Sequence, residues 1–287
     1  MNKKISAQIG LLIVTIIWGI TFVMVQEALD DALPFSLLTL RFGLATILTI
    51  LIINKNVFIF SKHEIFAGFF CGVILFFGYA FQTFGLWKNE FFNHSSPTNS
   101  AFITSISVLF VPIILVILKI QKIRLRIWFA VIMATIGLYF LLLPGGGINV
   151  GDFITFGCSI SFALHIILQD YYIKNKIQLM PLFCIQMATV TFISIVLSFY
   201  FESQPIEWTT QLINAILITG IFATFLGFLI MIWAQRILNP TETAIIFTTE
   251  PVAAAIFSML FAGEILGLWG WFGAFIICIA VIYGETG

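Results

Sequence analysis

The segment PTETAIIFTTEPVAAAIFSMLFA, residues 240–262, decides the fold class. It is mostly apolar and long enough to cross a bilayer, because a helix rises about 1.5 Å per residue through a hydrocarbon core about 30 Å thick. Nine further segments share this character. The ten predicted spans cover about residues 7–25, 35–53, 65–87, 98–118, 125–143, 152–172, 180–201, 211–235, 241–262 and 267–283. The sequence therefore predicts an all-α integral membrane protein with about ten transmembrane helices.

The composition agrees with this prediction. Hydrophobic residues make up 61% of the 287 residues and charged residues only 9%, whereas a soluble domain carries about 25% charged residues. Ten spans leave no room for a soluble domain. The formal net charge is zero, so charge gives no reason to expect a nucleic-acid partner. The four cysteines lie in apolar runs without a CxxC or Cys/His cluster, so we expect buried thiols, no metal and no cofactor.

Basic residues fix the predicted orientation. If the N-terminus is in the cytoplasm, eleven of the 13 Lys and Arg residues fall in cytoplasmic segments. Of the other two, Lys88 falls outside and Arg41 lies within a span. This asymmetry favours a multi-pass protein of the cell (inner) membrane with both termini cytoplasmic. The eleven are Lys3, Lys4, Lys55, Lys62, Lys119, Lys122, Arg124, Arg126, Lys174, Lys176 and Arg236.

The two halves of the chain resemble each other. Residues 97–140 align without gaps with residues 240–283 at a shift of 143, so that Pro97-Thr98 meets Pro240-Thr241. An odd number of spans in each half would bring the second half in from the opposite side of the membrane. We therefore expect two inverted-topology five-helix repeats, residues 1–146 and 147–287, a plan common in secondary transporters.

Short motifs along the whole chain resemble those of a known family. They are Trp18–Phe22, Leu40–Phe42, Gln82–Leu86, Ser100–Thr104, Trp233–Arg236, Ala244–Val252 and Phe261–Glu264. In this order the set is similar to EamA-type proteins of the drug/metabolite transporter superfamily. The resemblance implies ten helices in two inverted repeats, cytoplasmic termini and a central cavity. Members of this family include metabolite exporters and some importers, so the resemblance fixes neither the solute nor the direction of transport.

Two charged residues inside predicted spans are the first candidates for solute binding. Glu250 lies in an apolar segment, where an ionised side chain costs about 2.5–3.5 kcal/mol, and Pro251 removes a helical hydrogen bond beside it. It is a candidate for binding a cation, a proton or an amine; the alternative is a protonated, structural acid. For Arg41 three interpretations are open: it binds a carboxylate, pairs with Glu250 or snorkels to an interface.

Uncharged candidates follow at similar depth. His165 is a candidate for solute binding or proton relay, and Gln82, Gln186 and Thr249 are candidates for the pathway; for all four, packing between helices is the alternative. Trp18, Tyr79, Phe84 and Trp233 are candidates for aromatic walls around a solute, although packing against lipid explains most aromatic residues in a chain with 33 Phe.

The predicted function is secondary transport of a small metabolite by alternating access. The expected solute is an amino acid or related amphipathic compound, in export, with protons as a candidate coupling ion. The chain has no Walker A loop, so ATP is not the expected driver. Uptake or exchange of a nucleotide-like metabolite such as S-adenosylmethionine is one alternative, and a channel or membrane scaffold is another. An intramembrane enzyme would need paired catalytic groups, and no such motif is present, so we expect no enzymatic activity.

Overall fold

The structure of the protein is a computed structural model that describes residues 3–52, 60–142, 149–263, 265 and 267–285. Its first half consists of helices. The first three are α1 (Lys3–Ala28), α2 (Pro34–Ile52) and α3 (Lys62–Leu86). The fourth span is divided into α4 (Pro97–Ser105) and α5 (Ser107–Ile117), and α6 (Leu125–Leu142) follows. The first half therefore provides five helical spans, as predicted.

The second half repeats this plan. It begins with α7 (Val150–Lys174) and α8 (Leu179–Phe201). The next span consists of α9 (Thr210–Leu217), the π-helix η3 (Ile218–Leu226) and α10 (Gly227–Ala234). The fourth consists of α11 (Pro240–Phe247), α12 (Glu250–Phe257) and the π-helix η4 (Ser258–Ala262), and α13 (Leu268–Glu285) is the fifth. The described helix ends lie within a few residues of the predicted ones, and the predicted boundary between repeats falls outside the described residues.

Length and composition suit a bilayer. Among the described residues, eight spans are long and apolar enough to cross a membrane, and two shorter apolar helices occupy Leu125–Phe140 and Leu268–Gly284. Many large apolar side chains are exposed on the outside of the bundle, such as Phe199 at 81% and Phe275 at 63%. Because lipid is as apolar as these side chains, a membrane is the solvent in which such a surface is stable.

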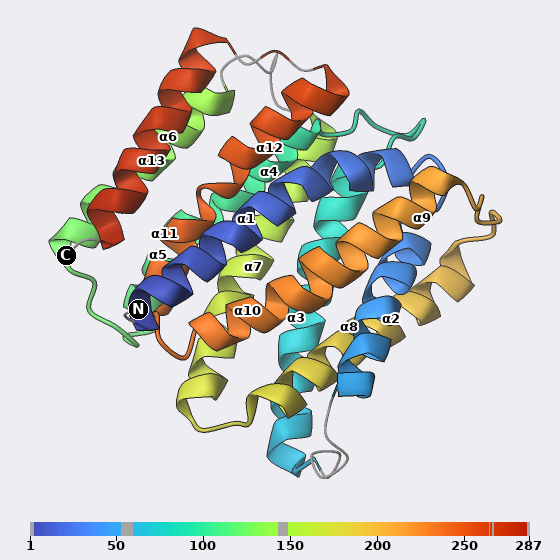
Figure 1. Ribbon diagram of the computed structural model, residues 1–287, viewed down its shortest axis with the longest axis horizontal. Helices are drawn as coiled ribbons and strands as arrows, with labels where there is room; N and C mark the ends of the chain where they lie inside the picture. Colours follow the sequence, from blue (N-terminus) through green and yellow to red (C-terminus); the bar gives the residue numbers. More distant parts are fainter. Residues whose placement is uncertain (1–2, 53–59, 143–148, 264, 266, 286–287) are drawn as a thin grey trace.

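Helices from the two halves interleave in the centre of the bundle (Figure 1). There, α3 packs against α7 and α8, α2 packs against α8, and α1 packs against α12, while α6 and α13 pack together at one edge. Two glycines allow the α3–α8 contact. A Cβ atom on Gly68 would lie 2.5 Å from Ile185, and one on Gly72 would lie 2.6 Å from Thr189.

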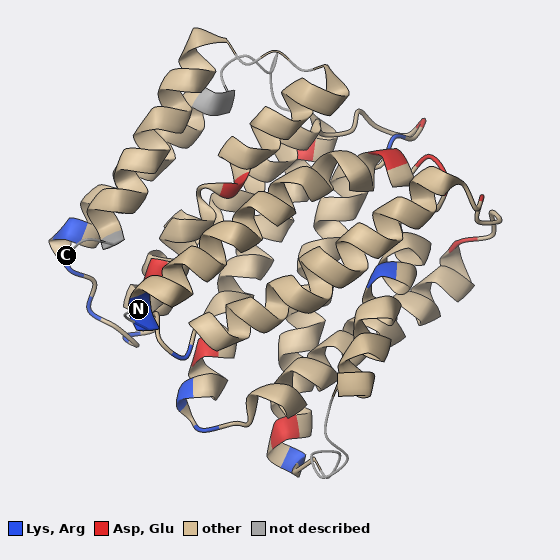
Figure 2. Cartoon of the chain, in the orientation of Figure 1, with Lys and Arg blue, Asp and Glu red and all other residues tan. Residues whose placement is uncertain are grey.

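Charge divides the bundle into two ends (Figure 2). The basic end, where both termini are marked, carries most of the blue segments together with a few red ones; Lys55 lies outside the described residues. The acidic end carries most of the other red segments, and the connections after α1, α3 and α8 contain Asp30, Asp31, Lys88, Glu90, Glu202 and Glu207. The structure thus groups the basic residues as the sequence predicts.

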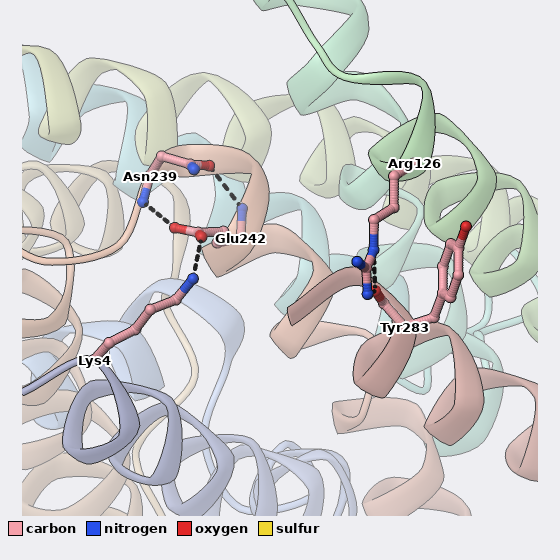
Figure 3. A network of polar contacts seen from close by, with 5 residues as sticks. All are labelled: Lys4, Arg126, Asn239, Glu242 and Tyr283. Carbon is pink, nitrogen blue, oxygen red and sulfur yellow. Dashed lines mark hydrogen bonds and ion pairs between the residues drawn. The ribbon is translucent and has the colours of Figure 1, made fainter. Parts of the chain in front are cut away.

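Polar contacts join the two halves at each end. At the acidic end, the Ser95 hydroxyl donates to Asp152 Oδ1 at 2.5 Å, and the Glu202 carboxylate accepts from the Phe35 and Ser36 amides. At the basic end, Lys4 Nζ lies 2.8 Å from Glu242 Oε1, and Asn239 and Glu242 cap the start of α11 (Figure 3).

A second contact in the same view fixes α6 to α13 (Figure 3). Arg126 donates from Nε and Nη2 to the Tyr283 carbonyl, at 2.8 and 2.6 Å.

The predicted burial of all four cysteines is wrong for Cys278, which is exposed on α13, while Cys71, Cys158 and Cys184 are buried.

Candidate functional site

The fourth span of each half is interrupted at an equivalent position. The helix breaks at Ile106 between α4 and α5, and at Thr248-Thr249 between α11 and α12. Ile106 and Thr249 are 143 residues apart, the same shift that aligns the two halves in sequence. Broken helices at corresponding positions of inverted repeats characterise the solute sites of many secondary transporters, because their free backbone groups lie near the middle of the membrane.

A proline explains only the second break. Pro251 occupies the first turn of α12 and has no N–H with which to continue α11. The Thr248 and Thr249 amides instead bond to the Ile245 and Ile246 carbonyls, each three residues earlier, both at 3.1 Å. The first break has no proline beside it. Pro112 lies inside α5, six residues after Ile106.

A cavity lies between the two interruptions. The space open to the centre of a water molecule is about 30 Å³, room for about two or three waters, since each needs roughly 10–15 Å³ by this measure. Its lining comes from α1, α2, α3, both interrupted spans, α7 and α10. The lining residues are Trp18, Thr21, Phe22, Arg41, Tyr79, Gln82, Thr104, Ser105, Ser107, Phe162, His165, Ile166, Phe228, Met231, Phe247 and Glu250.

Arg41 is held in this cavity by neutral groups. Its side chain is only 3% exposed. Nε donates to Thr224 Oγ1 at 2.6 Å, and the guanidinium carbon lies 4.6 Å from the centre of the Tyr79 ring. The bond from Nη2 to the Tyr79 hydroxyl is long, at 3.4 Å. The burial shows that snorkelling to an interface is the wrong interpretation of Arg41.

Glu250 is buried without a direct partner. It begins α12, is 5% exposed and lines the same cavity as Arg41. Among the described residues, its carboxylate makes neither a hydrogen bond nor an ion pair, although the charge of Arg41 acts on it across the cavity. The guanidinium and the carboxyl group therefore face one space without the direct pairing that was one interpretation of Arg41. An acid at a helix N-terminus is also favoured by the helix dipole.

The π-helix η3 holds two lining residues of the cavity in place. Trp18 Nε1 donates to the Ala223 carbonyl at 2.8 Å, and Arg41 bonds to the adjacent Thr224. The Trp18 ring also packs on Phe228, with centroids 5.4 Å apart. A π-helix leaves backbone groups out of the regular α-helical register, and η3 presents such a carbonyl to Trp18. Sequence reasoning missed this element.

Six of the ten predicted site residues line the cavity: Glu250, Arg41, His165, Gln82, Trp18 and Tyr79. His165 Nε2 lies 3.2 Å from Gln186 Oε1, within hydrogen-bonding distance. Gln82 Nε2 donates to Thr104 Oγ1 at 3.3 Å. The structure brings these groups together, and their role in binding stays a prediction.

The other four lie elsewhere. Gln186 supports His165 from behind, and Thr249 bonds to Thr15 Oγ1 at 2.8 Å between α1 and the second interruption. Phe84 packs on Phe35 near the acidic end, and Trp233 is 39% exposed near the basic end. Gln186 and Thr249 are absent from the lining because residues at the same depth can face any direction around a helix, whereas Phe84 and Trp233 lie closer to the two ends of their spans.

Ten lining residues were not predicted. They are Thr21, Phe22, Thr104, Ser105, Ser107, Phe162, Ile166, Phe228, Met231 and Phe247. The repeat could have indicated Ser107, because the shift of 143 pairs it with the candidate Glu250. Within the described ranges, no group of three His, Cys, Asp or Glu side chains is placed to hold a metal ion.

Comparison with known proteins agrees with this architecture. The model of the EamA-like transporter family matches twice, over residues 5–143 and 149–283. An uncharacterized transporter of Archaeoglobus fulgidus is 33% identical over 98% of this chain and 86% of its own length. The uncharacterized transporter YoaV of Bacillus subtilis is 24% identical over 96% of both chains. A protein of known crystal structure shares the fold, with a TM-score of 0.76, 13% identity and 97% of each chain covered.

The double match covers both halves, and the first relative is similar along almost the entire chain. Together with the apolar spans, these similarities make the protein a multi-pass membrane transporter, with a solute and a lipid bilayer as its partners. The chain belongs to the EamA-like transporter family.

Proposed function

We propose that the protein is a secondary transporter for a small metabolite that carries both an amine and a carboxylate, such as an amino acid or a related amphipathic solute. Transport is export across the cytoplasmic membrane by alternating access. The observation that carries this proposal is a basic and an acidic side chain, Arg41 and Glu250, which line one cavity without pairing directly.

The physical reason is desolvation. Burying a charge costs free energy unless partners compensate it, and here Arg41 has only neutral partners. A zwitterionic solute supplies both missing partners, with its carboxylate toward the guanidinium and its amine toward Glu250. The guanidinium is suited to a two-pronged contact with a carboxylate, and the aromatic walls suit an apolar side chain.

Alternating access follows from the size of the cavity and the repeat. Space for two or three waters is too small for an amino acid, so the bound state needs a wider cavity. Two five-helix repeats, which we assign to residues 1–146 and 147–287, provide two units that can tilt against each other around a central site. Glu250 is also the group that would take up a coupled proton, because it is acidic and central to the cavity.

The orientation is part of the proposal. We assign the basic end to the cytoplasm because Lys and Arg accumulate in cytoplasmic loops, which places both termini there. Single cysteines at Glu90 and Lys122, both exposed, test this in a cysteine-free protein. An impermeant thiol reagent should label Glu90→Cys in intact cells and leave Lys122→Cys unlabelled; the reverse pattern would overturn the orientation.

Counterflow in proteoliposomes tests the function. Vesicles loaded with unlabelled solute should accumulate the labelled solute transiently, because a carrier exchanges one molecule for another, whereas a channel only equilibrates it. The panel contains amino acids, their deaminated and amidated analogues, and S-adenosylmethionine. Accumulation of amino acids supports the proposal. Accumulation of the deaminated or amidated analogues without the amino acids, or equilibration without overshoot, contradicts it. S-adenosylmethionine also carries an amine and a carboxylate, so its accumulation alone would replace amino acids as the solute and keep the requirement for both groups.

A further inference from the structure

A second cavity lies along the same two helices as the central one. Ile166 of α7 and Met231 of α10 line the central cavity, while Lys176 beyond α7 and Arg236 beyond α10 line a groove at the basic end. By the same measure the groove has about 790 Å³. We call it the basic groove; its walls also include Ile173, Pro181, Ile232 and Trp233.

A pair of glutamines joins α7 to α10 just beyond the central cavity, while the groove also extends along α10 to Leu229 and Ile230. Gln169 follows Ile166 by three residues, and Gln235 follows Met231 by four, so each lies about one helical turn, roughly 5.4 Å, closer to the basic end. Gln235 Nε2 donates to the Ile166 carbonyl at 3.2 Å, and Gln169 Nε2 donates to Gln235 Oε1 at 2.5 Å. We call these contacts the amide clasp.

The amide clasp is incompletely satisfied. A carbonyl can only accept, so Ile166 fixes the orientation of the Gln235 amide, and Gln235 then fixes that of Gln169. Gln169 is 0% exposed and Gln235 is 1% exposed, yet Gln169 Oε1 has no hydrogen-bond partner. A buried acceptor without a partner disfavours the closed arrangement. Opening to water would satisfy it, which suits a contact that forms and breaks.

The two helices are otherwise held by different neighbours. The main contacts of α7 are with α3, α4 and α5, whereas those of α10 are with α1 and η3. Little backbone packing therefore has to be lost when α7 and α10 separate at the amide clasp. Elements that slide or tilt against each other need such a lightly packed contact.

The charge of the basic groove indicates its ligand. Lys176 and Arg236 are exposed, and within the described residues neither side chain has a hydrogen bond or an ion pair. The groove has no acidic lining residue. Two unpaired cations between apolar walls create a positive potential that concentrates carboxylates. The nearest acid along α7, Asp170, is already paired with Lys174 at 2.8 Å.

We propose that the basic groove receives the carboxylate of the solute at this end of the protein, and that the amide clasp is the gate between the groove and the central cavity. The proposal rests on the proposed function, because it names the entry route to that site. It assigns Gln169 and Gln235 to gating, and Lys176 and Arg236 to attraction of the solute.

Cross-linking tests the gate. Gln169→Cys and Gln235→Cys, combined in a cysteine-free protein, are joined by a short bifunctional thiol reagent. We expect counterflow to stop and to return on reduction, while a monofunctional reagent of the same chemistry leaves most of it. Joining Thr46→Cys to Thr191→Cys, whose native hydroxyls are 3.0 Å apart on the closely packed α2 and α8, should preserve transport. Full counterflow with the amide clasp joined would overturn the gate.

Charge removal tests the groove. Lys176→Gln and Arg236→Gln should each raise the half-saturating concentration of an amino acid presented at the basic end about three- to tenfold, and should not raise that of its amide, which keeps the ammonium group but lacks the carboxylate. Lys122→Gln removes one charge at the same end but outside the groove and is the matched control. Equal effects in all three variants would overturn the role of the groove.

Thiol labelling separates failure of the gate from failure of the proposed function. Ser107→Cys places a thiol in the central cavity and needs no solute for its detection. Adding Gln235→Ala removes the amide clasp and should speed labelling from the basic end at least fivefold. Adding Gln186→Ala, a buried amide beside His165, should not. If no amino acid shows counterflow, the proposed function fails; if Gln235→Ala leaves labelling unchanged, the gate fails.

Discussion

Gly19 allows α1 to approach the half-helix that begins with Glu250, so Gly19→Ala is a sharp test of the packing. A Cβ atom at this position would lie 2.6 Å from Ala253 Cβ and 2.8 Å from the Ala254 backbone nitrogen. Non-bonded carbon atoms are most stable at about 3.5–4.0 Å. The two helices would therefore have to separate by about 1 Å, and neither neighbouring group is the end of a flexible side chain.

The expected loss follows from these distances. Overpacking of this kind destabilises the folded protein by about 1–3 kcal/mol, whereas replacing Gly by Ala inside a helix stabilises it by about 0.5–1 kcal/mol. The free energy of unfolding should fall by up to about 2.5 kcal/mol by that balance. Gly19 directly follows Trp18, which lines the central cavity, so transport should fall as well.

A matched glycine on α2 provides the control. A Cβ atom on Gly43 would meet Thr191 Cγ2 at 3.7 Å, an ordinary contact, so Gly43→Ala should be neutral or slightly stabilising. Both variants are unfolded by denaturant in the same detergent, and counterflow is measured on each. Equal stability of Gly19→Ala and Gly43→Ala would refute the close approach of α1 to α12.

Three further substitutions test single contacts by unfolding in detergent. Thr224→Val leaves Arg41 Nε without its partner and should cost about 1.5–3 kcal/mol, whereas Thr224→Ser should be near wild type; equal losses would contradict the bond. Glu202→Gln weakens three hydrogen bonds at the start of α2 and should cost about 1–2 kcal/mol, while the exposed Glu207→Gln should not. Gly263→Ala forces alanine to a φ of 69° and should cost about 1–2 kcal/mol; no loss would show that this turn adopts another conformation.

Periodic and compositional signals predicted the fold well. Lipid-facing spans must be apolar for about twenty residues, so each was visible in the sequence without knowledge of its neighbours. The basic residues were also visible locally, because nearly all of them lie between the apolar spans or near their ends. Lys55 and Glu264 lie outside the described residues, as does the junction between the predicted repeats.

The cavity was harder to predict because it depends on contacts between distant segments. Arg41 and Glu250 stood out, since charges inside a membrane are costly. By contrast, Phe162 and Phe228 carry no signal that separates them from other phenylalanines. Nothing local in the sequence shows that Thr224 is the partner of Arg41, because the two are 183 residues apart.

Solute analogues test the central claim most directly, because they remove one charge of the solute at a time. Half-saturating concentrations for counterflow are measured for an amino acid, for its amide, which lacks only the carboxylate charge, and for its deaminated analogue, which lacks only the ammonium charge. The wild type should prefer the amino acid to both analogues. Arg41→Gln should abolish the preference over the amide, and Glu250→Gln the preference over the deaminated compound. If each variant instead weakens transport of all three solutes by the same factor, then Arg41 and Glu250 do not bind the two charged groups of the solute.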